Sequence, residues 1–275
     1  MSLEHVINLV DVRLEHPRGG PPLVRSANLG VGKGEVVLIV GAAGVGTSRL
    51  VAAALGELAI ADGTLEVLGR DVSRLRRSSL RMLRRRVGVV PQDLCLIEDR
   101  SAQLNVVLPL EIDGIPRSVS IARAAQVMTK LGLESEASLP VDCLSASARQ
   151  RVAVARALVR MPDLVIADHP TSMQDARGAE LVCTAMSEAA ACGAACIVLG
   201  RDPALRTLAE RHRWRQLALL NGTLQPLSEL DLDGESLESV LVAMESAPHA
   251  PPAIDPEIPN VVPFPISART AAGGL

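Results

Sequence analysis

The sequence predicts an α/β protein built on a parallel sheet, and three observations lead to this prediction. Glu35–Val40 is a short apolar run without polar alternation, which is the pattern of a strand buried on both faces. Leu164–Ala167 repeats that pattern and ends at Asp168. Strand-like and helical segments alternate along most of the chain, which is typical of a sheet covered by helices in three layers.

The first elements form a hairpin followed by a strand, a loop and a helix. Val6–Leu14 and Leu23–Val31 are rich in β-branched and apolar residues, and the glycines and prolines of Glu15–Pro22 predict a hairpin loop between them. Glu35–Val40 then runs into a glycine-rich loop and an Ala/Leu-rich helix at Ser48–Leu58. A strand, a glycine loop and a helix in this order are the context that a phosphate-binding loop requires.

The middle and the second half of the chain predict further strands and a helical subdomain. Strands are predicted at Thr64–Leu68 and Val87–Val90, and residues from about 95 to 148 have helical character. The remaining predicted elements are helices at Arg149–Val159 and Glu180–Ala191 and a strand at Ala195–Leu199. We therefore expect one domain over residues 1–228, with a helical subdomain at about 95–148.

Residues 229–275 differ in composition from the rest of the chain. They carry eight acidic residues and one arginine, a net charge of −7, which leaves +4 on residues 1–228 of a chain whose net charge is −3. Seven of the 18 prolines fall between Pro248 and Pro265. An acidic, proline-rich segment predicts a disordered tail. The tail either keeps the protein soluble, which we favour, or binds the basic body as an arm.

The scarcity of aromatic residues excludes one class of function. The chain has no Tyr, and Phe264 and Trp214 are its only Phe and Trp. An aromatic platform for single-stranded nucleic acid is therefore excluded. Arg70–Arg86 contains eight arginines, but no aromatic residue lies among them, so we interpret it as a solvated helix face and predict no nucleic-acid partner.

Cysteine usage and hydropathy predict a soluble intracellular protein. The five cysteines are odd in number and form no CxxC pair, which favours reduced thiols over a disulfide framework or a zinc site. The N-terminal residues show no basic-then-apolar signal pattern. No uninterrupted apolar stretch reaches about 18 residues, so we expect no transmembrane segment.

Four motifs in a fixed order carry a resemblance to a known family. The glycine loop stands at 41–48, Val-Val-Pro-Gln-Asp at 89–93, Leu-Ser-Ala-Ser-Ala-Arg-Gln-Arg-Val-Ala-Val-Ala-Arg-Ala-Leu at 144–158, and Leu-Val-Ile-Ala-Asp-His-Pro-Thr at 164–171. Over roughly residues 3–225 the sequence resembles the ABC ATPases, the nucleotide-binding subunits that pair with membrane permeases. The resemblance implies a P-loop NTPase fold with a RecA-like core, an antiparallel β subdomain and a helical subdomain.

Three shorter segments resemble one branch of this superfamily. Leu83–Asp93, Glu98–Arg100 and Asn105–Gly114 are similar to the cell-division ATPases of the FtsE type, with the lipoprotein-release and macrolide-export ATPases as close relatives. This resemblance implies a homodimer on an inner-membrane permease of the FtsX type and a role in cell division. It also implies a cytoplasmic location, peripheral to the inner membrane through the permease.

The resemblance assigns ATP and Mg²⁺ as cofactors and assigns residues to each. The phosphate loop comprises Gly41, Ala42, Ala43, Gly44, Val45, Gly46, Thr47 and Ser48. The Mg²⁺ contacts are Ser48, Gln92 and Asp168, and Gln92 also touches nucleotide and permease. Ser145 is the second residue of the signature motif, Leu144–Ala148, which in the family meets the γ-phosphate held by the opposite subunit. His16 stands about where the family places an adenine-stacking aromatic residue.

Several residues depart from the family pattern. Thr47 replaces the phosphate-loop Lys, whose charge-assisted contact is worth about 1.5–3 kcal/mol, or about one to two orders of magnitude in ATP affinity. Ala146 and Ser147 replace the two signature glycines, which permit close backbone approach. Each substitution weakens a nucleotide contact that the family makes.

The two residues assigned to catalysis are also replacements. His169 stands where the family has its catalytic Glu, and Arg201 stands where it has the switch His. His169 is either a base, since an unperturbed imidazole has a pKa of about 6.5, or an inert substitution, which we favour. Arg201 is either a cation for the γ-phosphate or a solvated surface residue, which we also favour.

Together these replacements predict a degenerate ABC subunit that keeps the fold and the permease but has weak or lost ATP hydrolysis. The alternative is a genuine ATP-hydrolysing subunit of the lipoprotein- or macrolide-export type that uses His169 as its base. A third reading, one half of a heterodimer, is weaker because the residues of both half-sites are altered.

Overall fold

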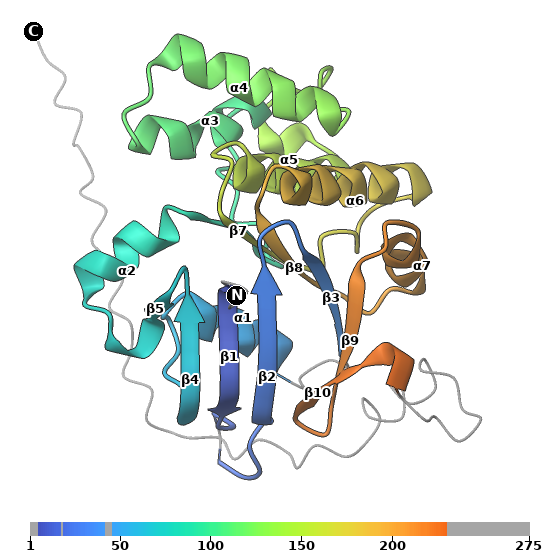
Figure 1. Cartoon of the computed structure of the whole chain (residues 1–275). Helices are drawn as coiled ribbons and strands as arrows, with labels where there is room; N and C mark the ends of the chain where they lie inside the picture. The colour runs from blue at the N-terminus through green and yellow to red at the C-terminus, as the bar shows by residue number, and fades with distance from the viewer. Residues whose placement is uncertain (1–4, 18, 42–45, 230–275) are drawn as a thin grey trace, which may run out of the picture.

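The computed structural model describes residues 5–17, 19–41 and 46–229, and their strands form one ten-stranded sheet (Figure 1). The strands are β1 (His5–Leu14), β2 (Val24–Gly32), β3 (Val36–Gly41), β4 (Asp62–Val67), β5 (Arg70–Asp71), β6 (Val87–Val90), β7 (Leu164–Asp168), β8 (Ala195–Leu199), β9 (Arg215–Leu220) and β10 (Thr223–Pro226). Their order is β5-β4-β1-β2-β10-β9-β3-β8-β7-β6. The α/β fold class predicted from the sequence is confirmed.

The sheet has an antiparallel part and a parallel part. Strands β5, β4, β1 and β2 pair antiparallel, whereas β9, β3, β8, β7 and β6 pair parallel. Every residue of β3, β7 and β8 is buried, as continuous apolar runs predict for strands covered on both faces. Because these strands are parallel, their carboxyl ends lie along one edge of the sheet.

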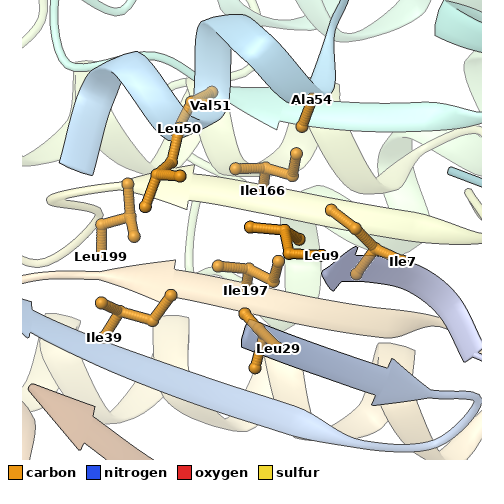
Figure 2. A pocket seen from close by; sticks show the side chains of 10 residues that line it. All are labelled: Ile7, Leu9, Leu29, Ile39, Leu50, Val51, Ala54, Ile166, Ile197 and Leu199. Carbon is orange, nitrogen blue, oxygen red and sulfur yellow. The ribbon is translucent and has the colours of Figure 1, made fainter. Parts of the chain in front are cut away.

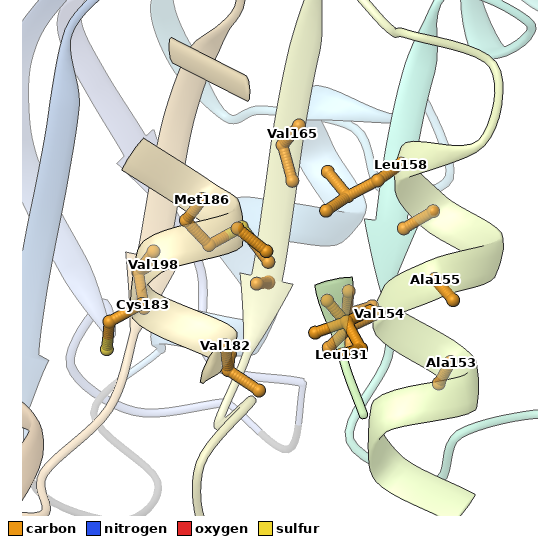
Figure 3. Close-up of a cluster of buried hydrophobic side chains, with 14 of the residues drawn as sticks. Leu131, Ala153, Val154, Ala155, Leu158, Val165, Val182, Cys183, Met186 and Val198 are labelled. Atoms are coloured by element: carbon orange, nitrogen blue, oxygen red, sulfur yellow. The ribbon is translucent and has the colours of Figure 1, made fainter. Parts of the chain in front are cut away.

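Helices cover one face of the parallel strands (Figures 1 and 3). The α-helices of the described residues are α1 (Thr47–Ala54), α2 (Arg77–Arg84), α3 (Ala102–Ile112), α4 (Arg117–Lys130), α5 (Ala146–Leu158), α6 (Ala176–Ala191) and α7 (Pro203–Arg211). Val154 of α5 and Met186 of α6 are fully buried in the same cluster as Val165 and Val198 of the sheet. Helices α3 and α4 pack on this layer from outside and carry Leu110 and Met128 into the same core.

Helix α1 lies on the other face, between the antiparallel strands and the parallel sheet. Figure 2 shows Leu50, Val51 and Ala54 of α1 above side chains from β1, β2, β3, β7 and β8. They surround a cavity of about 20 Å³ whose ten lining side chains are all apolar. An apolar gap of this size has no polar partner for a ligand or a water molecule, so it is a packing defect rather than a site.

Three helix boundaries differ from the prediction by three residues or more. Helix α1 ends at Ala54, not at Leu58, because Gly56 takes a left-handed φ of +66° that terminates the helix. Helix α5 begins at Ala146, three residues before the predicted start at Arg149, because the Ser145 side chain accepts a hydrogen bond from the Ala148 N–H and caps it. Helix α6 begins at Ala176, four residues before the predicted start at Glu180, because the Asp175 side chain accepts a hydrogen bond from the Gly178 N–H and caps the helix.

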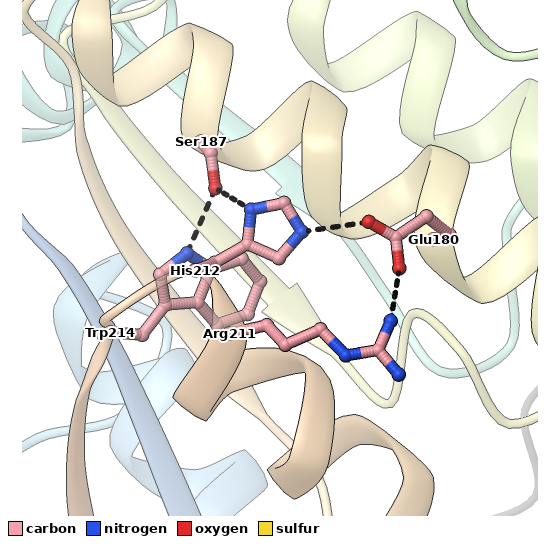
Figure 4. Close-up of polar contacts among 5 residues, drawn as sticks. All are labelled: Glu180, Ser187, Arg211, His212 and Trp214. Carbon is pink, nitrogen blue, oxygen red and sulfur yellow. Dashed lines mark hydrogen bonds and ion pairs between the residues drawn. The ribbon is translucent and has the colours of Figure 1, made fainter.

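A polar cluster ties α6, α7 and the start of β9 together (Figure 4). The indole N–H of Trp214 donates to Ser187 Oγ at 2.9 Å, and Ser187 Oγ lies 3.0 Å from His212 Nδ1. His212 Nε2 lies 3.2 Å from a carboxylate oxygen of Glu180, which also pairs with Arg211. Trp214 is thus committed to packing, and its ring is 7 % exposed.

No helix in the described part of the chain is long and apolar enough to cross a bilayer. Residues 1–4, 18, 42–45 and 230–275 lie outside the description, and with them the predicted tail and most of the glycine loop. Helices α3 and α4 fall inside the predicted helical subdomain at about 95–148. The predicted solvated face at Arg70–Arg86 contains α2, most of whose residues are exposed or half-buried.

The buried cysteines give a testable prediction about thiol reactivity. Burial raises the pKa of Cys183 and Cys196 to about 12. Because the thiolate is the reacting form, these two should resist thiol reagents in the folded protein, while the exposed Cys95, Cys143 and Cys192 react. We expect three reactive thiols in native protein and five after denaturation. Five fast thiols in native protein would contradict the burial.

The same pKa values predict a loss of stability in alkaline solution. A thiol whose pKa is raised on folding contributes stability that is fully present below its unfolded pKa of about 8.5. That contribution is lost as the pH rises through 8.5 toward the folded value. Thermal unfolding between about pH 8 and pH 11 should therefore show a falling midpoint, and the fall should be smaller in a Cys183→Ala/Cys196→Ala variant.

Candidate functional site

The predicted site residues follow neighbouring parallel strands at one edge of the sheet. Gln92 follows β6, Asp168 ends β7, Arg201 follows β8, and the glycine loop follows β3. The strand register aligns Val90 with Ala167, Asp168 with Leu199, and Ile39 with Leu199. The fold therefore brings to one edge four segments that are far apart in the sequence. In open α/β sheets this edge is where ligands bind.

Gly46 closes the glycine loop against the hairpin of the antiparallel part. It has a φ of +109°, and a Cβ there would lie 3.2 Å from both Leu23 Cβ and Val24 Cγ2. Glycine is therefore required at this position on two grounds, conformation and space. Helix α1 begins at the next residue, Thr47, so its N-terminal N–H groups face the loop. Ala42, Ala43, Gly44 and Val45 lie outside the described residues.

Ser48 and Asp168, 120 residues apart in sequence, are in direct contact. The Ser48 hydroxyl donates to Asp168 Oδ2 at 2.8 Å. Asp168 is 7 % exposed, and its other oxygen, Oδ1, is buried without a hydrogen-bond partner among the described residues. A hydroxyl beside a carboxylate with an uncompensated oxygen fits a hard divalent cation such as Mg²⁺, which prefers oxygen ligands. Ser48, Asp168 and the amide of Gln92 are the residues that would hold it.

His169 follows Asp168 in a left-handed backbone conformation, with a φ of +51°. Its N–H donates to the Leu199 carbonyl at 2.9 Å, and its own carbonyl accepts from Gln150 Nε2 and Ser172 Oγ. Its side chain is 24 % exposed, and Nε2 lies 3.9 Å from Asp168 Oδ1, which is too far for a hydrogen bond. The backbone of His169 is held firmly, whereas no carboxylate of the described residues lies within hydrogen-bond distance of its imidazole.

A network of glutamines joins the start of α5 to the segment after β7. Gln150, 2 % exposed, donates to the His169 carbonyl and accepts from the Met173 N–H and from Gln174 Nε2. Gln174 in turn donates to the Ser147 carbonyl and accepts from the Ser147 hydroxyl, both at 2.9 Å. The Ser147 side chain, which replaces a signature glycine, is thus hydrogen-bonded to this network.

Ser145 acts as the N-cap of α5. Its hydroxyl accepts from the Ala148 N–H at 3.1 Å, which satisfies one of the free N–H groups of the first turn. Ala146 and Ser147 occupy the first two helical positions. The N-terminus of α5 therefore remains a positive dipole end that could face an anion, but it presents two side chains that the family's glycines lack.

The loop that carries Gln92 is held by one arginine. Arg156 of α5 donates to the carbonyl oxygens of Leu94 and Cys95, two residues with left-handed φ values of +59° and +44°. Burial is the largest influence on the pKa of Arg156 and lowers it, while the charges of the nearby Cys95 and Asp93 raise it. Gln92 itself is exposed. The half-buried Arg156 guanidinium thus fixes the loop, and the Gln92 amide stays accessible.

The last two predicted residues lie at the periphery of the site. His16 is half-buried in the loop after β1, and the pairing of Leu14 with Val24 places that loop on the side of Gly46. Arg201 is exposed after β8 and precedes Asp202, whose side chain caps α7 through the Ala204 N–H. Trp214 cannot replace His16 as an adenine-stacking residue because it is buried among α6 and α7.

Comparison with known proteins settles the family. The profile of a family described as ABC transporter matches residues 24–172, more than half of the chain. This chain belongs to the ABC transporter family. The match contains Ser48, Gln92, Ser145 and Asp168.

Among curated ABC proteins, the lipoprotein-releasing system ATP-binding protein LolD of Neorickettsia sennetsu is 36 % identical over 194 residues, 69 % of this chain and 84 % of that protein. The methionine import ATP-binding protein MetN of Mesorhizobium japonicum is 36 % identical over 172 residues, 62 % of this chain and 47 % of that protein. The chain thus spans about half the length of its MetN relatives.

Solved structures agree with the family. The dimeric ABC transporter cassette MJ0796 superposes with a TM-score of 0.72 at 26 % identity, over 80 % of this chain and 96 % of that one. A second structure of the same cassette is described as a post-hydrolysis state bound to ADP and Pi, with the same score and coverage. The ABC cassette fold of this chain is therefore established.

Three residues that organise the site did not emerge from the sequence. Gln150, Gln174 and Arg156 each position a predicted site residue through its backbone or neighbours. Gln150 and Arg156 lie inside the motif at 144–158, and this position is the only feature of the sequence that connects them with the site. The contacts of Gln174 depend on α5 packing over the segment after β7, which the sequence does not show.

Proposed function

We propose that this chain is an ATP-binding subunit that works as a homodimer on a membrane permease and hydrolyses ATP weakly or not at all. One observation carries the proposal. Ser48 and Asp168 keep a 2.8 Å contact with an uncompensated carboxylate oxygen beside it, while their chain neighbours, Thr47 and His169, lack the charge and the carboxylate of the family.

The retained contact supports nucleotide binding, and the two replaced neighbours support weak or lost hydrolysis. The retained oxygens, Gly46 and the start of α1 provide a place for a phosphate and its Mg²⁺, whose chemistry is to neutralise phosphate charge. Thr47 contributes no positive charge, and none of the carboxylates in residues 5–17, 19–41 and 46–229 is hydrogen-bonded to the His169 imidazole. The chain therefore supports binding better than hydrolysis.

The cellular placement follows from the resemblances. Leu83–Asp93, Glu98–Arg100 and Asn105–Gly114 favour an inner-membrane permease of the FtsX type, a peripheral cytoplasmic location and a role in cell division. The alternative is an ATP-hydrolysing subunit of the lipoprotein-release or macrolide-export type with His169 as base and Arg201 as a phosphate cation. The identity to LolD over 84 % of that protein supports this alternative.

Calorimetric titration with Mg-ATP and an assay of phosphate release test the proposal. We expect ATP binding that weakens in an Asp168→Ala variant, and phosphate release no faster than in that variant. A turnover that requires Mg²⁺ and disappears in His169→Ala would instead support the alternative. Absence of binding at millimolar ATP would refute the ATP-binding part. Capture of the candidate permease from membranes, by wild type and Asp168→Ala alike, tests docking separately.

A further inference from the structure

The segment from Arg70 to Arg86 concentrates positive charge on one part of the surface. It carries eight arginines and one acid, Asp71, for a net charge of +7. It comprises β5, α2 and their connections, next to the antiparallel part of the sheet (Figure 1). The nucleotide site described above uses none of these residues.

Four of these arginines already have partners in the described structure. Arg84 donates to the Leu55 and Gly56 carbonyls, and the ion pairs are Arg74 with Asp71 at 2.9 Å, Arg85 with Asp113 at 3.9 Å and Arg86 with Asp163 at 2.8 Å. The other four, Arg70, Arg76, Arg77 and Arg81, are exposed and have no carboxylate within 4.0 Å among the described residues. We refer to these four as the arginine surface.

Repulsion among arginines lowers the stability of α2. Arg77, Arg81 and Arg85 follow one another at four-residue intervals, so their like charges share one helix face and repel. The helix has no acidic residue in its first turn and no side-chain cap at Arg76, although its N-terminus is the positive dipole end. An anion bound here would relieve both effects.

A hollow of about 200 Å³ lies beside these charges. It is lined by Leu68, Arg70, Met82, Leu83, Arg85 and Arg86. Met82 is 59 % exposed, so an apolar floor and an arginine rim occur together. Such a surface suits a ligand with carboxylates next to an apolar side chain better than a bare anion, because both kinds of group gain a contact.

We propose that the arginine surface binds the chain's own C-terminal segment at Ile254–Ile258. This segment reads Ile-Asp-Pro-Glu-Ile, in which Asp255 and Glu257 alternate with apolar residues. The carboxylates would pair with Arg77 and Arg81, and an isoleucine would enter the hollow beside Met82. Residues 230–275 carry seven acids and one arginine, a net charge of −6 that complements the +7 of the arginine segment.

The chain is long enough for this contact. Ile254 follows Glu229, the last described residue, by 25 residues, which span up to about 80–90 Å when extended. A compact domain of this size has a radius of gyration of about 17 Å, so a tether of this length is sufficient for the segment to reach α2. Tethering also supplies an effective concentration in the millimolar range, which makes weak contacts sufficient.

Arginine modification in the full-length protein tests the contact. Arg70, Arg76, Arg77 and Arg81 are reacted with p-hydroxyphenylglyoxal at low salt, and the rate at each is measured by mass spectrometry. We expect Asp255→Asn/Glu257→Gln to raise the rate at Arg77 and Arg81 about three- to fivefold, the factor for two exposed ion pairs. Exposed Arg177 on α6 serves as the internal control and should not change.

Two comparisons make the test specific to Ile254–Ile258. Asp231→Asn/Asp233→Asn removes the same amount of charge from residues 230–275 but leaves Ile254–Ile258 intact, and we expect it to leave the rates at Arg77 and Arg81 unchanged. Salt near 1 M, where the Debye length falls to about 3 Å, should raise the wild-type rates to those of the Asp255→Asn/Glu257→Gln variant. An equal effect of both double variants would overturn the assignment to residues 254–258.

Equal rates in wild type and the Asp255→Asn/Glu257→Gln variant would overturn the proposal altogether. Vesicles containing phosphatidylglycerol provide the competing arm. If they protect Arg77 and Arg81 while the tail substitutions have no effect, the arginine surface is a site for lipid headgroups and not for the tail. If they protect only the Asp255→Asn/Glu257→Gln variant, the tail occupies the surface in wild type, as proposed.

Discussion

Restoring the two replaced residues together, as Thr47→Lys/His169→Glu, is expected to convert this chain into a measurable ATPase. The lysine should raise ATP affinity by about one to two orders of magnitude, since a charge-assisted phosphate contact is worth about 1.5–3 kcal/mol. The glutamate should raise phosphate release by up to about 10²–10⁴-fold, the range for a positioned general base. Calorimetry and a phosphate-release assay measure the two effects separately.

The structure around residues 47 and 169 can accept both substitutions. The backbone of residue 169 is held by its N–H bond to Leu199 and by the Gln150 and Ser172 bonds to its carbonyl. None of these contacts involves the imidazole, so a glutamate should enter the same backbone position. Thr47 is the first residue of α1 and is half-buried beside the loop. A lysine there would stand at the N-terminus of α1, next to Gly46.

The two single revertants separate the contributions. Thr47→Lys alone should raise affinity with little turnover, and His169→Glu alone should raise turnover only at high ATP. Adding Ser48→Ala to the double revertant should raise the Mg²⁺ concentration that turnover requires, because it removes the hydroxyl bonded to Asp168 and leaves only Asp168 and Gln92 to hold the ion. A double revertant that matches wild type in both affinity and turnover would show that the replacements are not what limits this chain.

The substituted signature residues are expected to limit the revertant. Ala146 and Ser147 remain at the N-terminus of α5, where the family presents glycine to a phosphate held by the opposite subunit. Full activity in the revertant would mean that these side chains do not obstruct the contact. The hydrogen bond from Ser147 to Gln174 offers a reason, because it ties that side chain to the segment after β7.

The sequence predicts the strands of this fold well because their burial leaves a direct trace. Val87–Val90 and Ala195–Leu199 match β6 and β8 residue for residue. A strand covered on both faces must be apolar throughout, and that pattern ends sharply where the cover ends. Helix ends were less accurate, since the end of α1 depends on the left-handed conformation of Gly56 and the start of α5 on the Ser145 cap.

The site was predictable only as far as local motifs reach. The contact between Ser48 and Asp168 joins residues 120 positions apart, and the resemblance to a family, not the local pattern, pointed to both. The links from Gln150 to His169 and from Gln174 to Ser147 could not be predicted. They exist because the first turns of α5 pack over the chain that leaves β7, and a polar residue in a helix does not reveal which loop will lie beside it.

A large loss of stability from a single added methyl group is expected at Gly88. This residue lies in β6, the edge strand beside β7, and pairs with Val165. A Cβ there would meet the Ala157 carbonyl oxygen and the Pro162 ring at 3.0 Å. The carbonyl belongs to the last turn of α5 and cannot rotate away as a side chain would. Gly88→Ala must therefore move β6 away from α5.

Gly88→Ala should destabilise the protein by about 3 kcal/mol, the upper part of the range for overpacking, which lowers the melting temperature by about 6–12 °C. Because β6 leads directly to Gln92, displacement of this strand should also weaken any Mg²⁺-dependent ATP binding. Circular dichroism melts and guanidinium unfolding measure the stability.

Gly32→Ala is the matched control, because Gly32 ends β2 with its nearest neighbouring atom 3.9 Å from the added Cβ and without a left-handed φ. We expect its effect on stability to stay within about 0.5 kcal/mol. An equal loss in both variants would mean that general glycine effects, and not the Gly88–Ala157 approach, set the cost. A loss of stability confined to Gly88→Ala would show that the close contact between β6 and α5 sets the cost. Because Gln92 directly follows β6, the same contact would then couple the packing of this strand to the nucleotide site.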